Sequence, residues 1–149
     1  MVIAHILAAG ITTRHTRLMY QQDYILRQIE MMGALIRRML SAIHVGKTEE
    51  SLEMVEQMLE EIGISPDLAD SLPAEGLLAM LSAGGELDYG RAALLAAALN
   101  GRAAALDASE LSDRAAQDRA KADELFSAAY VGLDSTTREA LARLPHRSG

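Results

Sequence analysis

The segment YILRQIEMMGALIRRMLSAI, residues Tyr24–Ile43, decides the fold of this chain. Its apolar residues recur at alternating intervals of four and three for more than two heptads: Ile25, Ile29, Met32, Ile36, Met39 and Ile43. This spacing aligns them along one face of an α-helix. Further apolar side chains widen that face beyond the stripe of a two-stranded coiled coil: Tyr24, Met31, Leu35 and Leu40. The segment therefore predicts a helix with apolar neighbours on more than one side, as in a multi-helix bundle.

The composition favours helices packed on helices. The 149-residue chain contains eight Met but only one Phe and no Trp, and it lacks the alternating β-branched residues of strands. A chain of this length is one ordinary domain, large enough to bury roughly 70% of the surface exposed in its unfolded state. It has no Cys, as is common in the reducing cytoplasm. We therefore predict a cytoplasmic, all-α protein.

A second helix is predicted to fold back on the first. Gly46 can adopt the left-handed conformation that ends a helix, and Thr48 is a suitable N-cap for the next one. That helix has an apolar face, Leu52, Val55, Met58, Leu59 and Ile62, and an acidic face, Glu49, Glu53, Glu56 and Glu60. Folding back brings Arg37 and Arg38 to the level of this acidic face. Apolar burial must hold the antiparallel hairpin, because an exposed ion pair contributes only about 0–1 kcal/mol.

Within this hairpin four apolar residues are expected to be deeply buried: Ile29, Met32, Ile36 and Leu59. Two short helices should follow. Ser65 and Pro66 begin the first, which extends to Ser71, and the second covers Ala74–Ala83 until Gly84-Gly85 stops it.

The remaining sequence predicts two long helices and a short one. The first long helix runs from about Asp88 to Leu106, either broken at Asn100-Gly101 or continuous with Gly101 at a close helix crossing. The second covers Glu110–Tyr130, with expected ion pairs at four-residue spacing between Glu110 and Arg114, Arg114 and Asp118, and Arg119 and Asp123. Asp134 or Thr136 caps the last helix, the latter in a capping box with Glu139, and Pro145 ends it. The prediction is thus a bundle of about six helices.

The ends of the chain are predicted to lie outside the helical domain, which covers residues 20–145. Residues 1–19 are interpreted as a leader or N-terminal extension, and residues 146–149 as a polar tail. The apolar run Val2–Ile11 is too short to cross a bilayer, which takes about 20 residues. Docking on a membrane surface through this segment remains an alternative.

Charge is segregated along the chain. Residues 1–48 have a net charge of +4, residues 49–90 carry eleven acids and no Lys or Arg, and the remainder is balanced, for a total of −7. Because nucleic-acid binding depends on clustered cations, the acidic segment argues against a nucleic-acid partner. The acids are expected either to face the basic first helix or to attract a basic partner.

One stretch is similar to part of a tetratricopeptide repeat. Ala122-x-x-x-Phe126-x-x-Ala129 matches its second helix, although the Gly and Tyr pattern of the preceding helix and the closing Pro are absent. Together with Tyr20–Glu30 and Gly85–Asp88, it resembles an uncharacterised bacterial family of small helical, tetratricopeptide-like proteins over roughly residues 20–131. The resemblance implies an antiparallel helix-hairpin array and brings no known activity or catalytic residue.

Residues for catalysis, cofactors or metal binding do not form a recognisable motif. The four His residues lie in the leader, a turn and the tail without the spacing of metal ligands: His5, His15, His44 and His146. Three carboxylates near the short helices, Asp67, Asp70 and Glu75, and the neighbours Glu60 and Glu61 are interpreted as solvated rather than as general acids or bases. Six Met residues could line a binding groove, but core packing is the simpler interpretation: Met31, Met32, Met39, Met54, Met58 and Met80. We therefore expect no catalytic residue, no cofactor and no metal site.

The prediction for function is a non-enzymatic interaction or scaffold module. Its expected partner is a second copy of the chain, or a basic amphipathic helix of another protein. The residues expected to contact a partner are Tyr24, Met31 and Leu35 on the first helix and Glu53, Glu56 and Glu60 on the second. The rival is an enzyme whose acid–base residues come together from distant helices, which a carboxylate cluster or a His–carboxylate pair in a deep pocket would favour.

Overall fold

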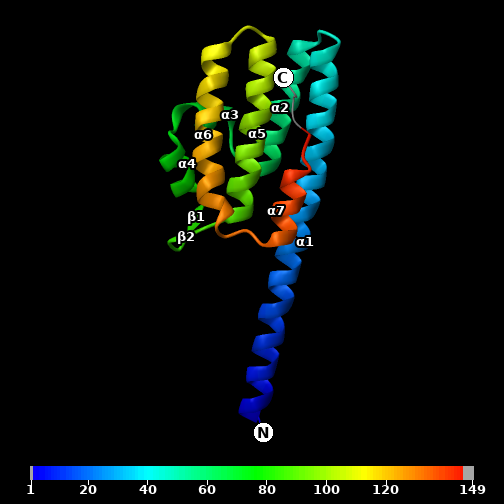
Figure 1. The fold of residues 1–149 in the computed structure, drawn as a ribbon. Coiled ribbons are helices and arrows are strands. Elements are labelled where there is room, and N and C mark those ends of the chain that lie inside the picture. The colour runs from blue at the N-terminus through cyan, green and yellow to red at the C-terminus, as the bar shows by residue number, and fades with distance from the viewer. Residues whose placement is uncertain (1, 146–149) are drawn as a thin grey trace.

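The computed structural model describes the backbone of residues 2–145 and the side chains of residues 22–145. Within that part of the chain the protein has seven helices: α1 (Val2–His44), α2 (Thr48–Ile62), α3 (Pro66–Ser71), α4 (Ala74–Met80), α5 (Tyr89–Ala108), α6 (Ser112–Tyr130) and α7 (Ser135–Ala142). Two short strands, β1 (Ser82–Ala83) and β2 (Glu86–Leu87), form an antiparallel hairpin. Figure 1 shows α5 at the centre, with α1 and α2 on one side and α6 on the other. The predicted all-α fold is confirmed.

The first two helices form the predicted antiparallel hairpin. Gly46 has a φ of 82° in the turn, where a side chain would be strained. Thr48 is the first residue of α2, and Lys47 holds the N-cap position without a side-chain hydrogen bond, so the predicted cap at Thr48 is wrong. Among the described side chains no ion pair joins α1 to α2. Apolar burial therefore holds this hairpin together, as the sequence indicated.

Helix α1 is longer than the predicted segment because it begins at Val2. Its C-terminal half lies along α2 and α5, and its N-terminal half extends beyond the other helices (Figure 1). The proposed leader, residues 1–19, is thus continuous with α1 from residue 2 onward. Its separation from the domain stays a prediction. The predicted tail, residues 146–149, lies outside the described residues.

The short elements between α2 and α5 show one correction. The Oγ atom of Ser65 accepts a hydrogen bond from the Leu68 backbone N–H at 3.2 Å, as expected of the N-cap of α3. Helix α4 ends at Met80, earlier than predicted. Gly84 and Gly85 have φ values of 62° and 83° and form the turn of the β1–β2 hairpin, so they are not a helix stop. Two consecutive positive φ values are what a two-residue hairpin turn of type I′ requires.

Helix α5 is the centre of the bundle and passes through Asn100-Gly101 without a break. Gly101 is buried, and a Cβ atom there would lie 3.4 Å from Cε of Met58 and 3.8 Å from Sδ of Met39. The sequence allowed either a break at Asn100-Gly101 or a continuous helix with Gly101 at a close helix crossing, and the structure has the second. Because Gly101 has no side chain, α5 can approach both α1 and α2 closely at this point. Asp88 caps α5 by accepting a hydrogen bond from the Arg91 backbone N–H at 3.1 Å.

The C-terminal elements pack back on the first helix. Glu110 takes a φ of 62° in the turn after α5, so α6 begins at Ser112 rather than at Glu110. Asp134 caps α7 by accepting a 2.7 Å hydrogen bond from the Thr137 backbone N–H, so the predicted box of Thr136 and Glu139 is not the cap. The Gln22 amide donates to Oδ2 of Asp134 at 3.1 Å and links α1 to the start of α7.

The four apolar residues predicted to be deeply buried lie in the core. Relative exposure is 4% for Ile29, Met32 and Ile36 and 0% for Leu59, which confirms the four expected core positions. Small residues of α5, Ala92, Ala93, Ala96 and Ala98 among them, are also buried. Since α5 is surrounded on most sides, its Ala residues allow close packing against several neighbouring helices.

Two glycines give a testable contrast in stability. A Cβ at Gly132 would overlap three ring atoms of Tyr89, whereas one at Gly33, inside α1, would make ordinary contacts of 3.5–4.0 Å. Gly132→Ala should therefore lower the free energy of unfolding by about 1–3 kcal/mol through overpacking. Gly33→Ala should raise it by roughly 0.5–1 kcal/mol, because Gly is unfavourable inside a helix. Urea denaturation of both variants tests this, and equal effects in the same direction would contradict it.

Candidate interaction surfaces

The outward face of the α1–α2 hairpin carries exposed apolar and charged side chains. Tyr24 is 55% exposed and Met31 is 40% exposed, one heptad apart. Arg27 and Arg38 lie on the same exposed side of α1, because residues three, four and seven apart share one helix face. We call this set, together with the exposed acids Glu53, Glu56 and Glu60 of the neighbouring α2, the hairpin face.

Leu35 does not belong to the hairpin face. It was predicted to contact a partner, but it is only 6% exposed and is part of the core. It lies one turn from Met31 along α1 but packs in the core cluster. The correction leaves five of the six predicted contact residues at the surface.

The methionines do not form an exposed binding groove among the described side chains. Met32, Met39 and Met58 are buried at 4%, 0% and 0% exposure. Met31 and Met80 are exposed, but they lie on different helices, α1 and α4. Core packing is therefore the role of the Met residues at the centre of the bundle.

The most buried charges of the described chain form an ion-pair network between α3, α5 and α6. Arg102 of α5 is 6% exposed and Asp118 of α6 is 3% exposed. The guanidinium donates from Nε to Asp118 Oδ2 at 2.7 Å and from Nη2 to Asp118 Oδ1 at 2.8 Å. Nη2 also donates to Oδ1 of Asp70 in α3 at 2.6 Å. Three helices are therefore joined through one arginine.

Two further cations complete this network. Arg114 lies 3.7 Å from the second carboxylate oxygen of Asp70, and the Lys121 ammonium donates to the backbone oxygens of Ala69 and Asp70 at 2.8 and 3.2 Å. The described part of the chain has no buried side-chain nitrogen or oxygen without a hydrogen-bond partner. The network is thus saturated, as a buried polar cluster must be to avoid a large desolvation cost.

The electrostatics of Arg102 agree with a structural role. Burial on its own lowers the pKa of this guanidinium, but the hydrogen bonds and charge of Asp118, followed by those of Asp70, outweigh burial and raise the pKa above its ordinary value. Stability that depends on a raised pKa is lost only as the pH rises through that pKa. Arg102 therefore stays charged throughout the usual range of pH.

The network also corrects the predicted pairs at four-residue spacing. Arg114 and Asp118 interact with Asp70 and Arg102, on other helices, and Arg119 pairs with Asp107 near the end of α5. No described ion pair joins two residues within α6. Asp70, interpreted from the sequence as solvated, is an ion-pair partner although half exposed.

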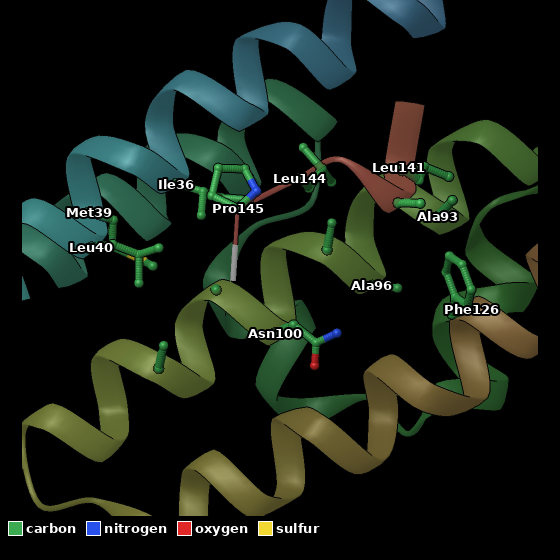
Figure 2. Close-up of a pocket in the computed structure, with 14 residues that line it drawn as sticks. Ile36, Met39, Leu40, Ala93, Ala96, Asn100, Phe126, Leu141, Leu144 and Pro145 are labelled. Carbon is green, nitrogen blue, oxygen red and sulfur yellow. The ribbon is translucent and has the colours of Figure 1, made fainter. Parts of the chain in front are cut away.

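A pocket of about 230 Å³ lies between α1, α5, α6 and α7. Figure 2 shows Ile36, Met39 and Leu40 on the α1 side and Phe126 on the α6 side. The α5 side consists of small residues and one amide, Ala93, Ala96, Ala97, Asn100, Gly101 and Ala104, and the α7 end of Leu141, Ala142, Leu144 and Pro145. None of these residues is ionisable, so the carboxylates of the Arg102 network do not reach this pocket.

Sequence reasoning missed both the pocket and the Arg102 network. A signal for the network existed, since Arg102 interrupts a run of Ala and Leu on a helix too apolar to face solvent. No sequence signal indicated the pocket, because Ala residues that line a pocket cannot be distinguished in sequence from Ala residues at a helix contact. Two of the three residues in the partial tetratricopeptide match are buried, and the third is exposed. Ala122 and Ala129 are buried, but Phe126 is 38% exposed at the pocket.

In the described part of the chain, no three His, Asp or Glu side chains gather in a way that would hold a metal ion. No helix there combines the length and the apolar character needed to cross a bilayer.

Comparison of the whole chain with protein-family models, with curated protein sequences and with solved structures gives no significant match in any of the three. The resemblance to a bacterial family of tetratricopeptide-like proteins therefore stays a prediction based on its sequence motifs.

Proposed function

We propose that this protein is a non-enzymatic interaction module that self-associates through the hairpin face. The observation that supports this most directly is the exposure of Tyr24 and Met31 on one side of α1, a helix whose opposite side is buried in the core. Two large apolar side chains one heptad apart form a stripe that a partner helix can cover.

The charges around this stripe favour a second copy as the partner. Arg27 and Arg38 are exposed beside the apolar pair, and Glu53, Glu56 and Glu60 are exposed on the adjacent helix. None of the five forms an ion pair with another described side chain. A two-fold axis would place α1 of one copy near α2 of the other, so that each cationic row meets an acidic row. One surface can thus be complementary to itself.

We expect the wild-type protein to form dimers and Met31→Glu to dissociate more readily, because the new carboxylate would lose water at the centre of the interface. Sedimentation equilibrium across protein concentration measures this. Met80→Glu is a matched control, since Met80 is 44% exposed but lies on α4, away from the hairpin face. A monomer at every concentration, or equal dissociation of both variants, would contradict the proposal.

Salt tests the charged part of the proposed interface. Pairing between Arg and Glu rows weakens as the Debye length shortens from about 30 Å at 0.01 M to about 3 Å at 1 M ionic strength. We therefore expect the dimer to weaken with salt but to persist through its apolar stripe. A dimer insensitive to salt would confine the interface to the apolar residues and exclude the charge pairing.

The alternative partner is a basic amphipathic helix of another protein lying along α2. The support for it is a set of six exposed glutamates on α2. None of them has a described ion-pair partner: Glu49, Glu50, Glu53, Glu56, Glu60 and Glu61. A monomeric wild type would shift the proposal to this second partner.

A further inference from the structure

The pocket between α1, α5, α6 and α7 extends along α5. Its lining on α5 extends from Ala93 to Ala104, which corresponds to roughly 16 Å of helix. A space that extends along a helix in this way can accommodate an extended chain.

The side chains that line the pocket are almost all apolar. Asn100 is the one lining residue with a polar side chain, and it is exposed. An apolar cavity of about 150 Å³ accommodates benzene, a molecule of six carbons, so this pocket has room for roughly eight or nine carbon atoms.

A cation lies near the segment after α7 that forms one wall of the pocket. The position that a Cβ atom would take at Gly33 is 3.5 Å from Leu144, 3.9 Å from Nη1 of Arg37 and 4.0 Å from Pro145. Leu144 and Pro145 line the pocket, so the Arg37 guanidinium lies beside that wall. Arg37 is exposed, and no described carboxylate lies within ion-pair distance of it.

We propose that this pocket binds an anionic amphiphile with an unbranched alkyl chain of about eight carbons, such as a medium-chain carboxylate. The chain lies along the Ala side of α5, between α1 and Phe126, and the carboxylate stays at the rim near Arg37. Burial of apolar surface drives binding, and the arginine selects an anionic head group over a cationic one.

Calorimetric titration of the full chain with hexanoate, octanoate and decanoate tests the proposal. We expect one site per chain and about a fourfold gain in affinity per added methylene, the equivalent of about 0.8 kcal/mol. The gain should cease beyond about nine carbons because the pocket is then full. Octylammonium should bind more weakly than octanoate. Absence of saturable binding, or affinity independent of chain length, would overturn the proposal.

Matched variants locate the site. Ala97→Leu fills the pocket from α5 and should abolish octanoate binding, whereas Ala120→Leu, at an exposed position on α6 outside the lining, should preserve it. Arg37→Gln should weaken octanoate severalfold and leave octanol unaffected, while Arg38→Gln, on the exposed hairpin face, should change neither. Equal affinity in Ala97→Leu and the wild type would refute the assignment.

Methyl NMR of the wild-type protein gives a test that depends on no variant. Octanoate should shift the methyl signal of Met39, which lines the pocket, and leave that of Met80, on α4, in place. Shifts at Met80 alone would refute the site. Because the pocket and the hairpin face use different residues, Met31→Glu should bind octanoate like the wild type even where it disrupts the dimer.

Discussion

Arg102→Met is expected to lower the free energy of unfolding by about 3–5 kcal/mol, the largest effect of any single substitution considered for this protein. The substitution leaves the Asp118 carboxylate at 3% exposure without the two hydrogen bonds that satisfy it. It also removes the contact that joins Asp70 of α3 to the centre of the bundle. Denaturation in urea, followed by circular dichroism, gives the difference.

Two further variants distinguish a buried pair from ordinary surface charge. Arg114→Met removes an ion pair of 3.7 Å whose two side chains are about half exposed, and it should cost less than about 1 kcal/mol. Combining Arg102→Met with Asp118→Leu removes both buried charges and should recover much of the stability lost in the single variant. If Arg102→Met and Arg114→Met proved equally mild, the network would not be the electrostatic centre of the fold.

The second large effect is expected for Leu59→Ala, at about 2–5 kcal/mol. Leu59 is fully buried in the core of the bundle, and removal of its side chain leaves a cavity that the surrounding helices can fill only in part. Ile36→Ala should fall near the lower end of the same range, because Ile36 already borders the open pocket. Urea midpoints with unchanged m-values would show that stability, rather than the unfolded state, has changed.

A surface substitution provides the control for these core variants. Val131 is 76% exposed at the end of α6, so Val131→Ala should stay within about 0.5 kcal/mol of the wild type. A loss below about 1 kcal/mol in both Leu59→Ala and Ile36→Ala would show that the heptad seam of α1 is not part of the core.

The local sequence determined most of the elements for identifiable reasons. The heptad seam from Ile25 to Ile43 predicted α1 and its buried residues, because a helical period of 3.6 places such positions on one face. Gly46 and Pro66 marked a turn and a helix start through backbone conformations that few other residues favour. Errors occurred where two local signals competed, as at Gly84-Gly85, where a pair of glycines suits a hairpin turn as well as a helix end.

The site could be predicted only in part. The hairpin face followed from helix periodicity, and five of its predicted residues are exposed. Leu35 differed because its burial depends on how the neighbouring helices are placed around α1, and helix periodicity gives no such direction. In the same way Arg114, Asp118 and Arg119 were assigned to pairs along one helix, but each pairs with a residue of another element.

The sequence by itself thus determined that this chain is an all-helical bundle, where most of its helices lie and which face of α1 is buried, because those properties depend on residues a few positions apart. Only the tertiary structure decided that Arg102 meets Asp118 and Asp70 from two other helices, and that the Ala side of α5 opens into a pocket beside Phe126. These features depend on how the helices are placed around α5. That placement follows from the packing of the whole core and from no single segment.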